Sequence, residues 1–185
     1  MNVEKTISTK KVYECPIFWV EEAEVELPNG SIAKRWYVVR HDAVLVICIR
    51  NESIIFLREF RSASKSVEWR LPSGGVKDGE EPLSAAIRET REEIGLEPLD
   101  IKLLKTFDNP SSTIKQKAHC FIATQFKENP LDTGEPEEKF NETKELTFDE
   151  ARALLNDGEF SASIEKALRV FFRKIKLLIL KVRAQ

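Results

Sequence analysis

The stretch from Gly74 to Leu96 most constrains this chain, because it joins a glycine-containing loop to a predicted helix with closely spaced carboxylates. Residues three and four positions apart are neighbours on a helix, which brings Glu89, Glu92 and Glu93 to one edge. Like charges at this spacing repel one another, so we expect a cation to neutralise them. Hard divalent cations such as Mg²⁺ take oxygen ligands and are held by a few carboxylates together with substrate phosphates. The stretch therefore predicts a metal site for a phosphate-containing substrate.

The ends of this helix are predicted by two residues. Pro82 suits the first helical turn, and Gly95 suits the position just after the last one. A buried stripe is expected on the face away from the acids. Its members are Leu83, Ala86, Ile87, Thr90 and Ile94.

The remaining elements follow from apolar patterning and turn residues. Strands are predicted over residues 17–27, 31–40, 43–50, 53–60, 101–107, 118–126 and 140–146. The first two are joined by the turn Pro28-Asn29-Gly30 and form an N-terminal β-hairpin. A short helix is predicted over 148–156, with Thr147 and Glu150 as a capping box, and a longer one from about Ser163. This order predicts an α+β fold, arranged as an α/β/α sandwich around a mixed β-sheet.

The same stretch also has a fixed spacing of particular residue types. Eight positions form the pattern: Gly74, Glu80, Arg88, Glu89, Glu92, Glu93, Gly95 and Leu96. They resemble the signature of the Nudix hydrolases, which cleave a nucleoside diphosphate linked to another group. Thr90 stands where that family more often has an aliphatic residue, although its methyl group can still face a core. The alternative is a solvated acidic helix face paired with Arg88 and Arg91, and eight matches at fixed spacing favour the functional interpretation.

The resemblance implies the Nudix fold, with residues 41–185 as the Nudix domain with C-terminal helices and residues 1–40 as a strand and hairpin extension of the same unit. Mg²⁺ is the expected cofactor and Mn²⁺ the alternative. The expected metal ligands are Glu89, Glu92 and Glu93. The resemblance adds a backbone carbonyl from the loop 73–75. A structural role is expected for Gly74, Glu80, Arg88 and Gly95.

A general base is also needed to activate water. The resemblance implies a glutamate on the acidic loop after the sheet, and the candidates are Glu135, Glu137, Glu138 and Glu142. We favour Glu137 or Glu138, because loop acids can close over a bound substrate. Glu92 remains a competing candidate for the same role.

The flanking segments resemble one branch of the family, the ADP-ribose and nucleoside-diphosphate-sugar pyrophosphatases. The resemblance rests on residues 58–61 (REFR), 69–74 (WRLPSG) and 107–111 (FDNPS). Substrate contacts are therefore expected from Arg61, Arg70 and Pro110. Two positions depart from the branch: Arg70 replaces a usual Glu, and Glu59 replaces a frequent Gln. An arginine suits bidentate phosphate recognition, so Arg70 can bind substrate, or it can be a solvated surface residue.

The leading hypothesis is Mg²⁺-dependent hydrolysis of the diphosphate bond of a nucleoside diphosphate sugar, with ADP-ribose giving AMP and ribose 5-phosphate. One alternative is another Nudix substrate, such as GDP-mannose, a dinucleoside polyphosphate or an oxidised nucleotide. A second alternative is a non-catalytic Nudix module that senses a ligand. Loss of a carboxylate from the motif would favour the sensor, and none is lost.

Composition limits the partners. A net charge of -2 gives no electrostatic case for nucleic-acid binding. Three scattered cysteines and no cleavable signal pattern favour a cytoplasmic location. The resemblance implies a homodimer in which N-terminal strands cross between subunits. The basic, amphipathic segment 167–185 is expected to pack on the body of the protein or on a second subunit, which we favour over a membrane-surface helix.

Overall fold

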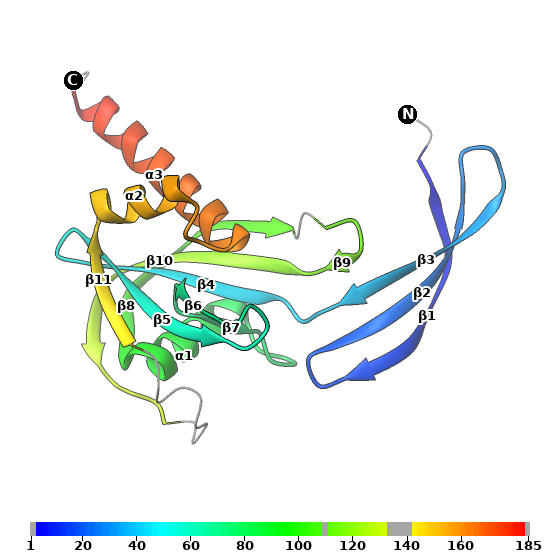
Figure 1. Ribbon diagram of the computed structural model, residues 1–185, viewed down its shortest axis with the longest axis horizontal. Helices are drawn as coiled ribbons and strands as arrows, with labels where there is room; N and C mark the ends of the chain where they lie inside the picture. Colours follow the sequence, from blue (N-terminus) through cyan, green and yellow to red (C-terminus); the bar gives the residue numbers. More distant parts are fainter. Residues whose placement is uncertain (1–2, 109–110, 133–141, 184–185) are drawn as a thin grey trace. The chain divides into compact units, whose positions relative to one another are not determined.

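The protein is described by a computed structural model that covers residues 3–108, 111–132 and 142–183, with side chains up to residue 176 (Figure 1). Its internal contacts divide the chain into two compact units. Unit 1 comprises Met1–Asp42 and Phe107–Ala118, and unit 2 comprises Ala43–Thr106 and His119–Gln185.

Unit 1 is built on a four-stranded sheet in the order β1-β2-β3-β9. Its strands are β1 (Lys5–Cys15), β2 (Phe18–Glu26), β3 (Ile32–Val39) and β9 (Ile114–Lys115). The predicted hairpin corresponds to β2 and β3, which pair antiparallel, whereas β3 and β9 pair parallel. β1 was not predicted as a separate strand, because its polar residues do not alternate with apolar ones. Nearly all of β1 is exposed.

Unit 2 is built on a seven-stranded sheet whose main path is β11-β5-β4-β10-β8, with β6 paired to β5 and β7 paired to β4. Its strands are β4 (Ala43–Arg50), β5 (Ser53–Arg61), β6 (Ser66–Arg70), β7 (Ser73–Gly75), β8 (Leu96–Asp108), β10 (Lys117–Glu128) and β11 (Glu142–Thr147). β8 begins directly after Gly95, whereas the predicted strand began at Ile101. The prediction was late because Pro98 and the acids around it are typical of a loop.

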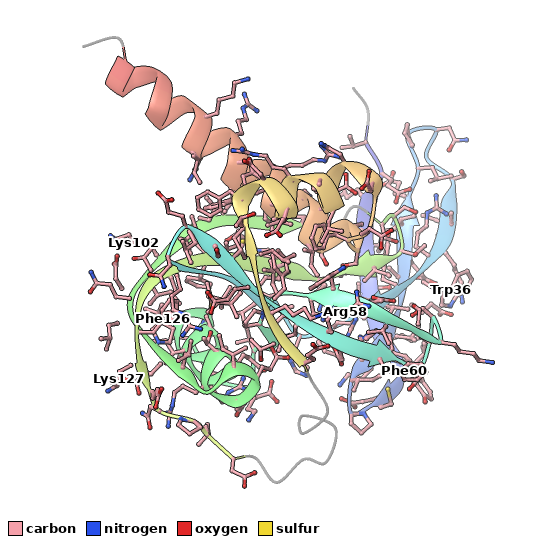
Figure 2. All side chains as sticks on the ribbon, turned by 60° about the vertical axis from the view of Figure 1, so that its left-hand side comes forward. Trp36, Arg58, Phe60, Lys102, Phe126 and Lys127 are labelled. Carbon is pink, nitrogen blue, oxygen red and sulfur yellow. The ribbon has the colours of Figure 1, made fainter. Side chains whose placement is uncertain are left out.

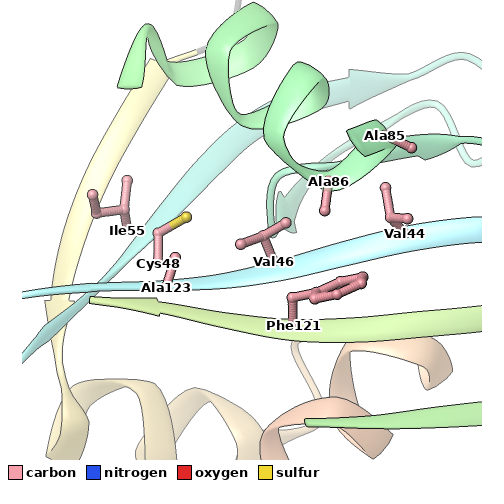
Figure 3. Close-up of a cluster of buried hydrophobic side chains, with 8 residues drawn as sticks. All are labelled: Val44, Val46, Cys48, Ile55, Ala85, Ala86, Phe121 and Ala123. Carbon is pink, nitrogen blue, oxygen red and sulfur yellow. The ribbon is translucent and has the colours of Figure 1, made fainter. Parts of the chain in front are cut away.

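Among the described residues, three helices cover this sheet, and Figure 1 shows α1 on one face and α2 and α3 on the other. They are α1 (Pro82–Ile94), α2 (Phe148–Asp157) and α3 (Ala162–Arg183). The core between α1 and the sheet is formed by small and β-branched side chains, drawn in Figure 3: Val44, Val46, Cys48, Ile55, Ala85, Ala86, Phe121 and Ala123. The predicted α/β/α arrangement is confirmed. Because alanines line the buried face of α1, the helix can lie close to β4 and hold its acidic edge firmly.

The ends of α1 agree with the sequence, and one member of its predicted buried stripe does not. Gly95 adopts a positive φ of 71° and its N–H donates to the Arg91 carbonyl, which closes the helix. Thr90 is fully buried, and its hydroxyl donates to the Ala86 carbonyl at 2.7 Å, so its methyl group can face the core. Leu83 is 46% exposed, and its predicted burial is therefore wrong. It lies in the first turn, where the chain is only beginning to approach the sheet.

The C-terminal helices pack through aromatic residues. The predicted capping box of α2 is present, with Thr147 and Glu150 bonding each other's backbone N–H groups. Phe148 of α2 makes edge contacts with Phe171 and Phe172 of α3, which anchors the first half of α3 on unit 2. Within the described part of the chain, no helix has the length and apolarity needed to cross a membrane.

Candidate active site

Arg88 is the centre of an ion-pair network on the acidic edge of α1. Its Nε donates to Glu80 at 2.9 Å, and its Nη1 donates to Glu89 at 2.6 Å and to Glu92 at 2.8 Å. Its Nη2 donates to the Gly75 carbonyl at 3.0 Å, which ties the helix to β7. The side chains of Arg88 and Glu92 are only 15% and 6% exposed. One guanidinium therefore balances several largely buried carboxylates and fixes the loop against the helix.

Glu93 is the most deeply placed carboxylate of the motif and takes no part in the Arg88 network. Its Oε2 accepts a hydrogen bond of 2.8 Å from the Ser73 backbone N–H. Burial raises the pKa of Glu93 to about 8, and the nearby charge of Glu89 adds to this effect, against the hydrogen bond from Ser73. A carboxylate in this position is costly to ionise without a nearby cation.

Gly74 approaches the carboxylate of Glu89 closely. A Cβ atom at position 74 would overlap the Glu89 carboxylate, so only glycine leaves room for it. Burial raises the pKa of Glu89, even though Arg88 lowers it. Glycine at this position therefore forms a recess for a carboxylate that lacks full charge compensation.

These residues have the donor chemistry for a divalent cation. Glu89, Glu92 and Glu93 offer carboxylate oxygens from one helix edge. Burial raises the pKa values of Glu89 and Glu93, so a nearby cation would favour their charged forms. In the described ranges, no three His, Cys, Asp or Glu side chains are already grouped as metal ligands. Arg88 instead takes the oxygens of Glu89 and Glu92. These carboxylates could hold a metal if their contacts with Arg88 were rearranged.

The predicted substrate residues Arg61 and Arg70 lie together on the β5–β6 hairpin, joined by Glu59. Arg61 Nη1 donates to Glu59 Oε1 at 2.9 Å, and Arg70 Nε lies 3.4 Å from Glu59 Oε2. Arg70 Nη2 donates to Ser73 Oγ at 3.1 Å. Arg70 Nε is buried and makes only the longer ion-pair contact, without a hydrogen bond. The role of Ser73 and the bridge through Glu59 were not predicted, although the register that pairs Leu57 with Arg70 places these side chains on one face.

The other face of this hairpin is aromatic and exposed. The Arg58 guanidinium lies 4.5 Å from the centre of the Trp69 ring, and Phe60 is 61% exposed (Figure 2). Phe60 lies opposite Val67 in the strand register, and Val67 is also exposed. The polar and aromatic faces of β5–β6 are thus separated by strand alternation.

Several predicted residues cannot be placed in this site. Pro110 and three of the base candidates, Glu135, Glu137 and Glu138, lie outside the described residues. Glu142, a further base candidate, lies at the start of β11 and its carboxylate pairs with Lys144 at 3.3 Å. Among the base candidates, Glu92 is therefore the one that the structure places on the acidic edge of α1.

Comparison with known proteins decides the family. The sequence profile of the NUDIX domain matches residues 39–168, which include the whole of the site described above. The chain belongs to the Nudix family. A second profile, the nucleoside diphosphate sugar hydrolase N-terminal domain, matches residues 4–39 of this Nudix protein. The expected resemblance to the nucleoside-diphosphate-sugar branch is confirmed.

Curated relatives span most of the chain. The methanol dehydrogenase activator of Bacillus methanolicus is 32% identical over 149 residues, covering 80% of each chain. The ADP-ribose pyrophosphatase of Bacillus subtilis (strain 168) is 29% identical over 157 residues, covering 84% of this chain and 85% of the relative. The protein is accordingly a Nudix hydrolase that is similar in sequence to ADP-ribose pyrophosphatases.

A solved structure supports the fold. The crystal structure of an ADP compounds hydrolase superposes with a TM-score of 0.81 at 24% identity and covers 94% of both chains. At this identity the likeness concerns the fold alone, and the predicted Nudix fold is confirmed.

Proposed function

We propose that this Nudix hydrolase cleaves the diphosphate bond of a nucleoside diphosphate sugar, with ADP-ribose as the leading substrate and AMP and ribose 5-phosphate as products. The observation that carries the proposal is the placement of Glu89, Glu92 and Glu93 on α1, with Glu89 against Gly74 and with Glu93 buried so that its pKa is raised. The matches to the nucleoside diphosphate sugar hydrolase profile and to the Bacillus subtilis ADP-ribose pyrophosphatase support the substrate class.

In this proposal Glu89, Glu92, Glu93 and a backbone carbonyl of residues 73–75 would hold Mg²⁺, or Mn²⁺ in its place. When bound, such an ion neutralises phosphoryl oxygens and makes a coordinated water a better nucleophile. Glu80 and Arg88 would hold the loop against α1. The hydrogen bonds of Arg88 with Glu80 and with the Gly75 carbonyl support this role.

The remaining residues bind substrate and move the proton. Arg61 and Arg70 hold phosphate oxygens on the polar face of the β5–β6 hairpin. The water proton passes to a carboxylate, for which Glu137 and Glu138 are the first candidates and Glu92 the alternative. Pro110, which lies outside the described residues, is proposed to contact the substrate, as the resemblance of residues 107–111 implies.

We further propose that the protein forms a homodimer and is located in the cytoplasm. A homodimer is favoured because β1 leaves Ile7, Val12 and Tyr13 exposed along a long edge strand, which is a surface that proteins usually cover. A cytoplasmic location fits three free thiols, of which Cys48 and Cys120 are buried. Burial raises the pKa of Cys120 to about 12, so this thiol stays protonated at neutral pH.

A substrate panel tests the activity. ADP-ribose, GDP-mannose, a dinucleoside polyphosphate and an oxidised nucleoside triphosphate are incubated with Mg²⁺, and the products are separated by chromatography. AMP and ribose 5-phosphate from ADP-ribose, lost with EDTA and restored by Mg²⁺, are the expected result. Turnover of none of these compounds would contradict the proposal and favour the ligand-sensing module.

The variant Glu93→Gln tests the metal assignment. Glutamine keeps an oxygen that can accept the Ser73 N–H but loses the negative charge, so kcat is expected to fall by about a hundredfold or more. Thermal stability in EDTA should rise, because a buried carboxylate is replaced by a neutral side chain of equal size. Near-normal turnover would remove Glu93 from the metal site.

A further inference from the structure

β8 is an edge strand of the sheet in unit 2 and exposes two leucines. It ends the strand order next to β10, and no strand pairs with its outer edge within residues 3–108, 111–132 and 142–183. Leu99 and Leu103 are 57% and 54% exposed. A long edge strand presents backbone N–H and C=O groups to which another strand can bond. β8 is therefore a surface on which a further strand could add to the sheet.

The charges of β8 are arranged symmetrically about Ile101. Proline and lysine often protect an edge strand from unwanted pairing, and β8 contains both residue types. Each of two lysines, however, has an acidic residue at the mirror-image position, and each exposed leucine has another leucine there. The mirror-image pairs are Asp100 with Lys102, Leu99 with Leu103, and Glu97 with Lys105. Protection by repulsion alone needs no such symmetry.

This symmetry makes β8 complementary to itself. If two copies pair antiparallel with Ile101 opposite Ile101, each residue faces its mirror-image position in the other copy. Both lysines of each strand then face an acid, and the leucines face leucines. Opposite charges and apolar residues directly across an antiparallel pair stabilise it, whereas like charges destabilise it. A surface that is complementary to itself fits a twofold interface between identical chains.

The two faces of β8 would make different contacts. Because side chains alternate along a strand, Leu99 and Leu103 lie on the same face as Ile101, which packs against the core under α1. Asp100 and Lys102 lie on the opposite face and pair with each other at 3.1 Å. Two copies would therefore form an apolar cluster on one face and a group of four alternating charges on the other.

Pro98 lacks the N–H that an antiparallel ladder uses, so it would remove one hydrogen bond from the pairing. The residue at its mirror-image position is Leu104. The carbonyl of Leu104 already accepts a hydrogen bond of 3.1 Å from Nζ of Lys174 on α3. The missing N–H of Pro98 would therefore not leave this carbonyl without a donor.

We propose that β8 pairs antiparallel with β8 of a second copy of this chain, centred on Ile101, so that the sheets of the two unit 2 copies become continuous. The inference goes beyond the proposed function and does not depend on the substrate. It also uses a different edge from β1, which belongs to unit 1. A chain that uses both edges would form a tetramer with two kinds of twofold interface.

Reversal of single charges tests this register. Lys102→Glu places acids opposite one another, and Asp100→Lys places lysines opposite one another. Each variant alone should raise the dissociation constant of the assembly by about tenfold or more, because two like-charged pairs replace two opposite ones. The two variants mixed in equal amounts should associate with each other, since every acid then faces a lysine. Sedimentation velocity over a range of concentrations measures these constants.

An apolar variant gives a second readout. Leu103→Lys removes an exposed side chain from the centre of the interface and should halve the mass of the assembly. Leu83→Lys is the matched control, because Leu83 is an exposed leucine of α1, 46% exposed, and its variant should keep the wild-type mass. A monomeric wild-type protein, or an unchanged mass in Leu103→Lys, would overturn the inference. Failure of the mixed charge variants to associate would overturn the register centred on Ile101.

Discussion

Two glutamates in different units make ion pairs of similar length, yet their pKa values are shifted in opposite directions. In unit 1, Glu22 lies 3.1 Å from Lys10 and 3.1 Å from Lys34, and these hydrogen bonds lower its pKa. In unit 2, Glu89 lies 2.6 Å from Arg88, yet burial raises its pKa. The shorter contact therefore belongs to the carboxylate that is harder to ionise.

The difference arises because burial of Glu89 outweighs its pairing with Arg88, whereas the hydrogen bonds from Lys34 and Lys10 outweigh burial at Glu22. Lys10 and Lys34 are 66% and 50% exposed, so water already solvates their charges and the pairs add little. Arg88 is 15% exposed and is shared by several carboxylates, so each pair is formed at a desolvation cost that one guanidinium does not fully offset. Distance alone does not show what an ion pair does. The imbalance in unit 2 is what a cofactor cation could relieve.

The variant Arg88→Ala should give the largest effect, because it leaves Glu80, Glu89 and Glu92 without their shared partner. Removing one member of a buried ion pair costs about 3–5 kcal/mol, measurable as a fall in the free energy of unfolding in urea. Adding Mg²⁺ should recover part of this loss if the carboxylates bind the ion. Arg169→Ala, at an exposed position of α3, is the control and should lie close to wild type. Equal effects of the two variants would remove the contrast between buried and exposed networks.

The variant Gly74→Ala should give a smaller effect on the same cluster. The new Cβ would displace the Glu89 carboxylate and disturb its contact with Arg88, at a cost of about 1–3 kcal/mol in unfolding free energy, the range for overpacking. Gly75→Ala is a matched stability control, because a Cβ at position 75 would meet no atom within 4 Å. Similar melting temperatures for the two alanine variants would show that the recess at position 74 does not constrain Glu89.

Much of the fold of unit 2, and the clustering of its acidic residues, could be predicted from the sequence. The helix from Pro82 to Gly95, the capping box at Thr147 and the order of strands all follow from local chemistry, namely turn residues, caps and apolar periodicity. The clustering of the motif glutamates follows from helical spacing alone. These features depend on residues within about one or two turns of one another.

The partners that cross between elements could not be predicted. Ser73 reaches Glu93 across 20 positions of sequence, and Glu59 meets Arg70 only through the register of a hairpin. β1 was missed because its stabilising partner is β2 and its own sequence is polar. Sequence patterning also placed Leu83 in the core, since periodicity identifies a face of the helix but not where the helix first contacts the sheet.

The variant Glu22→Gln should give the smallest effect, because it removes only the ion pairs with the exposed lysines. Glutamine can still accept the hydrogen bond that Trp36 donates to Glu22 at 3.1 Å, so only the pairing with Lys10 and Lys34 is lost. Because the folded pKa of Glu22 is lowered, its contribution to stability is present above its ordinary pKa of 4.5 and is lost as the pH falls through the folded value. The difference in unfolding free energy between wild type and Glu22→Gln should thus be small at pH 7 and vanish as the pH falls below the lowered folded pKa of Glu22. A difference as large as that of Arg88→Ala, or one that grows at low pH, would show that exposure of the lysines does not set the strength of these pairs.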